Sequence, residues 1–223
     1  AIEEILKKGK TPIIAGGTGL YVNSLIYNIQ YNDIKIDEEY RKYLEERVEK
    51  EGLQSLYEEA KNIDFEAMKS ISQNDKKRIL RVLEMYHQTG KTKTELEKES
   101  RKEEVKYDYK VYAINWEREE LYKRINKRVD IMIEQGLIKE VENILKKYDK
   151  FPTAMQGLGY KEVVEYLDKK ITKEEMIEKI KMETRRYAKR QITWFRKNKE
   201  IYWLDGTENI NNNVNTILKE CNY

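Results

Sequence analysis

The feature that most constrains this chain is the density of its charges. Of its 223 residues, 38% are Asp, Glu, Lys or Arg, against roughly 25% in a typical globular domain. Hydrophobic residues make up only 39%, enough for the thin core that amphipathic helices build from one apolar stripe each. Because 44 basic and 41 acidic residues nearly cancel, and the chain holds 17 Tyr and 3 Trp, we do not expect disorder. With only two Pro and ten Gly, the chain has few of the residues that form the many turns of an all-β fold, so helices should dominate.

The residue counts also exclude several kinds of site. The single cysteine, Cys221, excludes a disulfide framework and a Cys-rich zinc site, and the single histidine excludes a multi-histidine metal site. That histidine, His87, lies near a helix end, and we do not expect it to be a catalytic base. No apolar run approaches the roughly 18 residues that span a bilayer, and no signal peptide is visible. We therefore expect a cytoplasmic protein that does not enter a membrane.

By pattern, the chain divides into three parts. Residues 1–31 contain an apolar strand over Thr11 to Ala15, the turn Gly16 to Gly19 and a helix that starts at Leu20, which is a strand–turn–helix unit of α/β type. Residues 32–105 have a helical pattern throughout and are predicted to be a helical insertion. Residues 106–223 return to an α/β pattern.

In that last part, strands are predicted over Tyr109 to Trp116 and Ile201 to Leu204, and a loop around Phe151 and Pro152. Capping residues mark several helix starts: Asp37, Asp64, and Asn74 or Asp75. Thr172 to Glu175 reads as a capping box that opens the longest helix, which ends near Lys197. The sequence pattern predicts helices over residues 2–8, 20–27, 37–51, 64–70, 75–90, 118–135, 137–148, 159–167, 172–197 and 210–218.

The most basic stretch is TRRYAKRQITWFRKNK, Thr184 to Lys199. It contains no acid and seven basic residues, namely Arg185, Arg186, Lys189, Arg190, Arg196, Lys197 and Lys199, whereas the whole chain carries only +3. At helical spacing, one set of side chains can face a core and another can share the outer face. The inner set is Tyr187, Ala188, Ile192 and Phe195, and the outer set is Arg186, Arg190, Thr193 and Lys197. A cationic face with Trp and Gln beside it suits a nucleic-acid backbone; the alternative is a solvated face that lacks acids.

Three weaker motifs each have two interpretations. Lys76, Lys77, Arg78 and Arg81 lie in the first turns of a predicted helix, where cations oppose the macrodipole at a cost of about 0.3–1 kcal/mol each. A bound phosphate would offset that cost, and an ordinary soluble surface is the alternative. The glycines of GGTG either let backbone N–H groups approach an anion or simply form a tight turn, and the chain has no Walker A spacing. MQGLGYKE, Met155 to Glu162, is either a loop close to a ligand or a plain helix start.

Five motifs, taken together and in this order, resemble the tRNA dimethylallyltransferase (tRNA isopentenyltransferase) family. They are GGTGLY, NDKKRILRVLEMYHQTGKTKTEL, RVDIMIEQGLIKEV, MQGLGYKEVVEYL and YAKRQITWFR. Each is weak alone, but five in register over nearly the whole chain are specific. The resemblance implies a helix-rich α/β fold. Residues 1–31 and 106–223 would form a partial P-loop NTPase-like core, and residues 32–105 an inserted all-helical subdomain that grips the anticodon stem-loop of tRNA.

The resemblance also implies a reaction and its partners. A dimethylallyl group passes from dimethylallyl diphosphate to the exocyclic amine of the adenosine beside the anticodon, with Mg²⁺ aiding departure of the diphosphate. The target base is turned out of the loop, as enzymes acting on a stacked base must arrange. The diphosphate charge must be neutralised, the amine aligned and its proton removed. We expect a monomer that binds tRNA and the diphosphate and no membrane.

Contacts with tRNA are implied at particular positions. Two are single residues, Thr18 in GGT and Arg41 in DEEYR. The others form three stretches: Lys77, Arg78, Ile79, Leu80 and Arg81; Gln156, Gly157, Leu158, Gly159, Tyr160 and Lys161; and Lys189, Arg190, Gln191, Ile192, Thr193, Trp194, Phe195 and Arg196. Position 156 is Gln or Arg among family members, so the role of Gln156 is the least defined.

The chain departs from the family pattern in one large respect. Family members begin with a strand and a P-loop of the form GPTASGKT, followed by an Asp that acts as general base, and neither is present here. We therefore expect the C-terminal two thirds of such an enzyme, with no catalytic residue of its own and no activity alone. One alternative is a stand-alone helical RNA-binding or adaptor protein derived from this fold. Another is a relative that prenylates free adenine nucleotides, although the basic stretch and the long insertion favour polymeric RNA.

Overall fold

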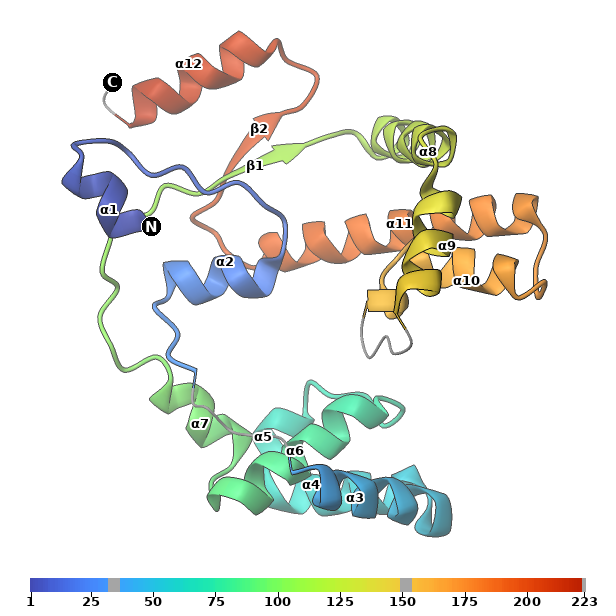
Figure 1. Cartoon of the computed structure of the whole chain (residues 1–223). Helices are drawn as coiled ribbons and strands as arrows, with labels where there is room; N and C mark the ends of the chain where they lie inside the picture. The colour runs from blue at the N-terminus through green and yellow to red at the C-terminus, as the bar shows by residue number, and fades with distance from the viewer. Residues whose placement is uncertain (32–36, 149–153, 222–223) are drawn as a thin grey trace. The chain divides into compact units, whose positions relative to one another are not determined.

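The structure is a computed structural model that describes residues 1–31, 37–148 and 154–221 (Figure 1). The chain folds as two compact units. Unit 1 consists of Ala1–Gly19 and Tyr109–Tyr223, and unit 2 is Leu20–Asp108. The expected start of the insertion at residue 32 and the expected loop at residues 151 and 152 lie outside the described residues.

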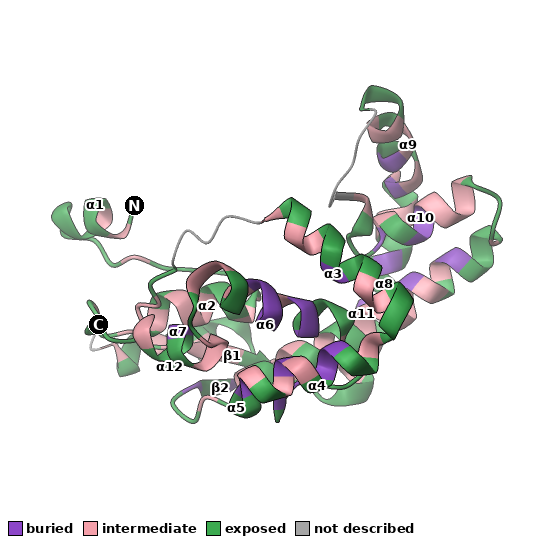
Figure 2. Cartoon of the chain, turned by 90° about the horizontal axis from the view of Figure 1, so that it is seen from below, coloured by how far each residue is buried: buried purple, intermediate pink, exposed green. Residues whose placement is uncertain are grey.

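Among the described residues of unit 2, the regular elements are all helices. Its core comes from α3, α4, α5 and α6, whose buried faces are visible along α4 and α6 in Figure 2. The buried residues at its centre are Leu44, Leu56, Ala60, Met68, Ile79, Val82 and Leu83. The helices are α2 (Gly19–Ile26, which starts at the last residue of unit 1), α3 (Glu38–Glu51), α4 (Leu53–Ile63), α5 (Phe65–Met68), α6 (Lys76–Thr89) and α7 (Lys93–Glu99).

Local capping chemistry determines where these helices begin. The Asp37 carboxylate accepts a hydrogen bond from the Tyr40 N–H at 2.9 Å, and Asp75 accepts one from the Arg78 N–H at 3.2 Å. Asp64 caps α5 in the same way through the Ala67 N–H at 3.0 Å. All three predicted caps are confirmed, since each satisfies a backbone donor that the first helical turn leaves unpaired.

Unit 1 combines helices with a small sheet. Four of the helices, α8 to α11, share a core built from Val129, Leu137, Val141, Val163, Met176 and Ile180. The predicted capping box of the longest helix is confirmed, because Thr172 and Glu175 exchange both hydrogen bonds. The elements are α1 (Ile2–Lys7), β1 (Tyr112–Asn115), α8 (Arg118–Glu134), α9 (Leu137–Lys147), the 3-10 helix η1 (Ala154–Gln156), α10 (Tyr160–Leu167), α11 (Lys173–Phe195), β2 (Tyr202–Asp205) and α12 (Ile210–Glu220).

The sheet corrects one prediction. It consists, among the described residues, of β1 and β2 paired in parallel, with Tyr112 opposite Tyr202 and Asn115 opposite Asp205. The strand predicted over residues 11–15 is wrong for this structure: the segment has no strand partner, and Ile13 is 88% exposed. An apolar β-branched run becomes a strand only where another strand satisfies its backbone. The fold is therefore helix-rich with a small parallel sheet.

Candidate nucleic-acid interface

The GGTG turn lies directly on α11. The side-chain Nε2 of Gln191 donates a hydrogen bond to the Gly17 carbonyl at 2.7 Å. A Cβ at Gly17 would lie 2.6 Å from that same nitrogen, and one at Gly19 would overlap the Trp194 ring. The glycines are therefore required because the backbone of the turn approaches two α11 side chains more closely than any side chain would allow. Thr18, between them, is exposed.

This contact joins two motifs that lie far apart in the sequence. Gln191 and Trp194 belong to the basic stretch, and they hold Thr18 beside it. The contact with α11 explains why this turn contains glycines. The glycines alone are therefore not evidence that the turn binds an anion. Thr18 keeps its hydroxyl available at the surface of unit 1.

The outer face of α11, together with the turn that follows it and contains Lys197, has the composition that helical spacing predicts. Arg186, Arg190, Thr193 and Lys197 are all exposed, while Ala188, Ile192 and Phe195 are partly buried. Tyr187 was predicted to face the core and does not: it is 40% exposed, and the Arg190 guanidinium lies 5.7 Å from its ring centroid. Trp194 is 39% exposed, with Lys197 Nζ at 5.9 Å from its ring. Two aromatic rings therefore stand on the cationic face, each beside a cation.

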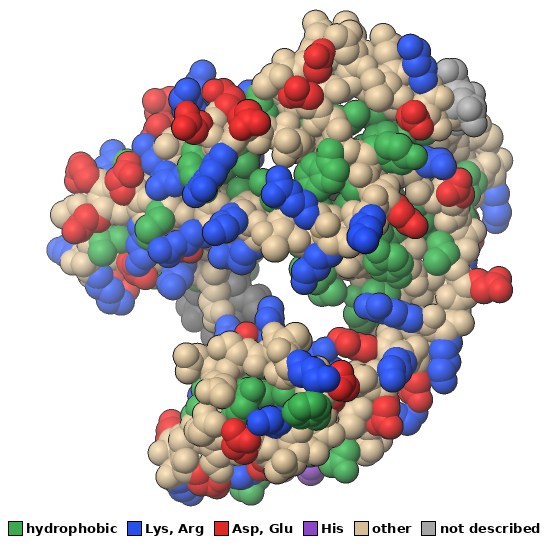
Figure 3. All heavy atoms as spheres, turned by 180° about the vertical axis from the view of Figure 1, so that it is seen from behind, with side chains coloured by type: hydrophobic (Ala, Val, Ile, Leu, Met, Phe, Trp, Pro, Cys, Tyr) green, Lys and Arg blue, Asp and Glu red, His purple; other side chains and the backbone are tan. Residues whose placement is uncertain are grey.

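Neighbouring elements do not neutralise this face. Arg185 donates to Asn126 Oδ1 at 2.6 Å, and Arg186 pairs with Glu183 at 2.5 Å. Within the described residues, the other cations of the stretch form no ion pair; they are Lys189, Arg190, Arg196, Lys197 and Lys199. Figure 3 shows Lys and Arg side chains in a band across one face of the molecule. Five cations crowded without counter-charges repel one another, and a polyanion would relieve that repulsion.

The QGLGYK stretch forms a well-defined helix start. Gly159 has φ of +94°, which favours glycine, and its N–H donates to the buried Glu162 carboxylate at 2.9 Å. The Tyr160 hydroxyl donates to Glu140, and this hydrogen bond raises the pKa of Tyr160. Gln156, Gly157, Leu158 and Lys161 are exposed.

This start lies alongside the middle of α11. Glu165 of α10 pairs with Lys179 of α11, so the two helices form an antiparallel hairpin. The first residues of α10 therefore lie next to α11 several residues beyond Lys179, toward the basic stretch. The QGLGYK start therefore opens the helix that packs against α11, and α11 carries most of the basic stretch.

In unit 2, the cations at the start of α6 divide into two groups. Lys76 and Lys77 are exposed and form no ion pair with any described residue, and Arg78 lies 3.4 Å from its capping Asp75. Ile79 and Leu80, expected from the resemblance to contact tRNA, are 0% and 6% exposed in the unit 2 core. Their side chains pack in the core of unit 2, and the exposed side chains at this helix start are those of Lys76, Lys77 and Arg78.

A buried carboxylate holds two further arginines. Glu84 of α6 accepts from Arg41 Nε at 2.7 Å and from Arg41 Nη2 at 3.0 Å, a bidentate pair. Arg81 donates to the same carboxylate at 3.3 Å. The pairing with Glu84 raises the pKa of Arg41. Sequence reasoning singled out both arginines and missed Glu84, which lies one turn from Arg81 on α6 and meets Arg41 through the packing of α3 on α6.

Comparison with known proteins identifies the family. Residues 1–198 match the family described as IPP transferase. The chain belongs to the IPP transferase family. Its relatives include the tRNA dimethylallyltransferases of Acetivibrio thermocellus and Halothermothrix orenii, which are 49% and 47% identical over 93% and 92% of this chain. The matched regions are 66% and 62% of those proteins, so the chain spans about two thirds of their length.

Solved IPP transferase structures have the same fold. The full-length tRNA isopentenylpyrophosphate transferase of Bacillus halodurans is 37% identical, with a TM-score of 0.65 over 99% of this chain and 68% of that one. A eukaryotic dimethylallyltransferase acting on tRNA is 27% identical, with a TM-score of 0.71 over 98% of this chain and 60% of that one. The order of the five sequence motifs thus predicted the family correctly.

Two further features of this IPP transferase chain are its acidic, histidine and cysteine side chains as possible metal ligands, and the single histidine, His87. No group of three or more His, Cys, Asp or Glu side chains within the described ranges is placed to bind a metal ion. His87 stacks on Tyr40, with ring centroids 3.7 Å apart, and lies 3.9 Å from Asp37. Its position is explained by packing between α3 and α6.

None of the described helices has the length and hydropathy of a membrane span.

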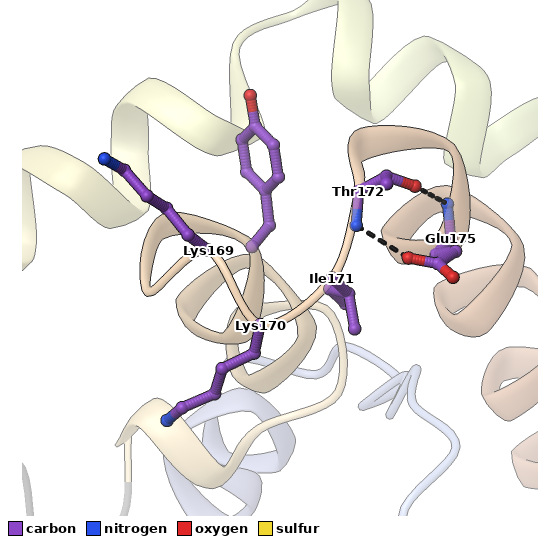
Figure 4. Close-up of a pocket in the computed structure, with 6 residues that line it drawn as sticks. Lys169, Lys170, Ile171, Thr172 and Glu175 are labelled. Carbon is purple, nitrogen blue, oxygen red and sulfur yellow. Dashed lines mark hydrogen bonds between the residues drawn. The ribbon is translucent and has the colours of Figure 1, made fainter.

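A hollow at the turn between α10 and α11 is also explained by local structure (Figure 4). Three of its lining residues have partners within the turn, since Thr172 and Glu175 bond each other and Lys170 pairs with Asp168 at 2.8 Å. The hollow is therefore a product of the helix turn. It is lined by Tyr166, Lys169, Lys170, Ile171, Thr172 and Glu175.

Proposed function

We propose that this chain is the tRNA-binding portion of a tRNA dimethylallyltransferase. The complete enzyme would transfer a dimethylallyl group from dimethylallyl diphosphate to the exocyclic amine of the adenosine beside the anticodon. Family membership supports the reaction, and the α11 face supports the substrate. The single observation that carries the proposal is the joining of GGTG to the unneutralised cationic face of α11 by Gln191 and Trp194.

In this proposal, unit 1 holds the anticodon loop. Lys189, Arg190, Arg196 and Lys197 contact backbone phosphates, which fix register without reading sequence. The exposed ring of Trp194 offers a surface on which an unstacked base can lie, a contact worth about 1–3 kcal/mol per base. Thr18 contributes a hydroxyl that can donate or accept beside that ring. Together these groups would receive a loop whose target adenosine has been turned out.

Unit 2 would hold the stem. Its exposed Lys76, Lys77 and Arg78 cluster at the start of α6, where a phosphate would offset the unfavourable macrodipole interaction. Arg41, oriented by Glu84, adds a planar guanidinium with donors left over for a phosphate. We assign unit 1 to the partial P-loop NTPase-like core of the family and the unit 2 helices to its inserted subdomain, acting in the cytoplasm as a monomer.

The chemical step needs groups beyond those described. Departure of the diphosphate requires charge neutralisation and deprotonation of the amine requires a base. The described residues do not offer the carboxylate cluster that would bind Mg²⁺, and the 223 residues contain no P-loop motif. We assign diphosphate and Mg²⁺ binding to the additional length of the full-size relatives.

Binding to a synthetic anticodon stem-loop tests the proposal. We expect Arg190→Gln with Lys197→Gln to lower affinity and to flatten the dependence of log K on log salt by about two units, roughly one for each lost phosphate contact. The control is Lys139→Gln with Lys146→Gln on α9, which removes the same charge elsewhere in unit 1 and should change the slope little. Absence of binding by the parent chain, or equal effects of the two double variants, would refute the proposal. Competition by free adenine nucleotides at the same site would favour the nucleotide-prenylating alternative.

A further inference from the structure

A second basic surface lies on α8. Four cations occur within six residues, at Lys123, Arg124, Lys127 and Arg128, and all four are exposed. They fall into two i, i+4 rows of like charge, an arrangement that destabilises an isolated helix by about 0.2–0.5 kcal/mol per pair. Neither the packing of unit 1 nor the residues implied by the family resemblance accounts for this surface.

The two rows differ in their partners. Arg124 lies over the Trp116 ring, 4.0 Å from its centroid, so it is held by an aromatic contact within unit 1. Lys123 is 3.9 Å from Glu120, and both side chains are well exposed. Lys127 has no carboxylate partner in the part of the chain that the structure describes. Arg128 likewise has no carboxylate partner among the described residues, so neither row is neutralised, and the lysine row is distinguished by its position on α8.

The lysine row runs next to the cationic face of α11. Three contacts show that α8 and α11 are antiparallel: Lys181 with Asp130 at 2.8 Å, Arg185 with Asn126 at 2.6 Å, and Arg185 over the Tyr122 ring at 5.9 Å. Extending this alignment by one turn brings Lys189 opposite Tyr122. Lys123 is the next residue after Tyr122 on α8, on the side turned to solvent, and Lys127 follows one turn later on the same face.

We propose that Lys123 and Lys127 of α8 bind backbone phosphates of the RNA, as an extension of the α11 face. The proposal rests on the proposed function, because the ligand is the same tRNA. Lysine ammonium groups on flexible stems suit phosphates as point charges and carry no base specificity. The α8 row would thus lengthen the contact along the RNA backbone without altering which base is presented.

The test measures stem-loop affinity against salt for the whole chain. We expect Lys123→Gln with Lys127→Gln to weaken binding about tenfold or more near 0.1 M salt and to lower the salt slope by about two units. The loss should be equal for stems of different sequence. Lys123→Arg with Lys127→Arg should restore the slope, and Lys139→Gln with Lys146→Gln on α9 is the control of equal charge. A helical circular dichroism spectrum and thermal midpoint like the parent's establish that each variant folds.

The outcomes separate this proposal from the one on which it rests. If the parent chain does not bind the stem-loop, both proposals fail. If the parent binds and the α11 variant is weakened, but the α8 glutamine variant keeps the parent's affinity and slope, the α8 proposal alone is wrong. A loss that depends on stem sequence, or that the arginine pair does not restore, also overturns it, because phosphate contacts require only charge.

Discussion

At the scale of single residues, buried carboxylates organise unit 2. Glu84 is only 2% exposed, yet it binds two arginines that come from α3 and α6. Such a group is tolerated because each carboxylate oxygen has a charged donor. The two hydrogen bonds to Glu84 thereby fix the orientation of the Arg41 guanidinium, whose side chain is still 37% exposed.

Replacing Glu84 tests this organisation. Glu84→Gln keeps the shape of the side chain but removes the charge that both arginines bind, so we expect a loss of about 1–3 kcal/mol in the free energy of unfolding. The loss stays below that of a fully buried pair because Arg41 can still reach water. Urea unfolding measures it, with Glu97→Gln as the control, since Glu97 pairs with Lys93 at the surface. Equal midpoints for the two variants would contradict the role given to Glu84.

Asp64 makes the stability of unit 2 sensitive to acid. Burial acts to raise the pKa of its carboxyl, but hydrogen bonds from the Ala67 N–H and from the N–H and hydroxyl of Thr94 outweigh it, and the pKa is lowered. A pKa lowered by folding stabilises the native state above the unfolded-state pKa, and that stabilisation is lost as pH falls through the folded-state pKa. It should therefore fade below about pH 4.

Thr94→Val is the variant that isolates this effect. It removes one donor to Asp64 and leaves the carboxylate, so the folded-state pKa should rise toward its ordinary value. We expect the acid unfolding midpoint to move to higher pH, and the difference in stability between parent and variant to shrink as Asp64 protonates. Circular dichroism followed against pH measures both. A constant stability difference at all pH values would show that Thr94 acts only by packing.

At the scale of secondary-structure elements, helix starts could be predicted from the local sequence, whereas strand pairing could not. The helix starts at Asp37, Asp75 and Thr172 were predicted because an N-cap acts within four residues of chain. The start of α7 at Thr92 has the same T-x-x-E signature and was not predicted individually. The strand expected over residues 11–15 failed because strand formation depends on a partner elsewhere, which no local pattern reports.

The candidate site was likewise predictable where it depends on local sequence and not where it depends on contacts between distant residues. The cationic face of α11 follows from helical spacing, whereas its contact with GGTG depends on how residue 17 meets residue 191 in space. A family resemblance indicates which positions belong to a motif but not which side chains are buried. Ile79 and Leu80 were therefore included among the expected contacts, although both side chains lie in the core of unit 2. The four cations of α8 lie within six residues of sequence, and sequence reasoning did not single them out.

Glycine substitutions in the turn test the contact between GGTG and α11. Gly19→Ala places a methyl group where the Trp194 ring lies, so we expect the turn to shift, a loss of about 1–3 kcal/mol in stability and weaker stem-loop binding. Gly16→Ala is the matched control, because a Cβ there meets no atom within 4 Å. Thermal unfolding and Trp fluorescence report the two effects. If both alanine variants behave alike, the close approach of the turn to Trp194 does not matter in solution.

At the scale of the whole molecule, the chain has two cores and no shared one among the described residues. One core lies within unit 2 and the other joins α8 to α11 in unit 1. Each unit presents exposed cations without counter-charges, at the start of α6 and along α11. If both units bind one RNA, as proposed, their two modest contacts would combine through effective concentration.

By itself, this chain should not catalyse prenyl transfer. Incubated with dimethylallyl diphosphate, Mg²⁺ and unmodified tRNA, the 223-residue chain should yield no modified adenosine above background. Loss of a general base typically costs about 10²- to 10⁴-fold, and loss of the donors that stabilise the leaving diphosphate adds to this. Thr18 and the backbone of its turn offer at most one wall of such a site. The full-length Acetivibrio thermocellus relative, assayed beside it, supplies the positive control, and stem-loop binding by the same preparation shows that the chain is folded. Robust turnover by the isolated chain would mean that a base and a diphosphate site lie within residues 1–223, and the assignment of chemistry to the additional length of the relatives would be wrong.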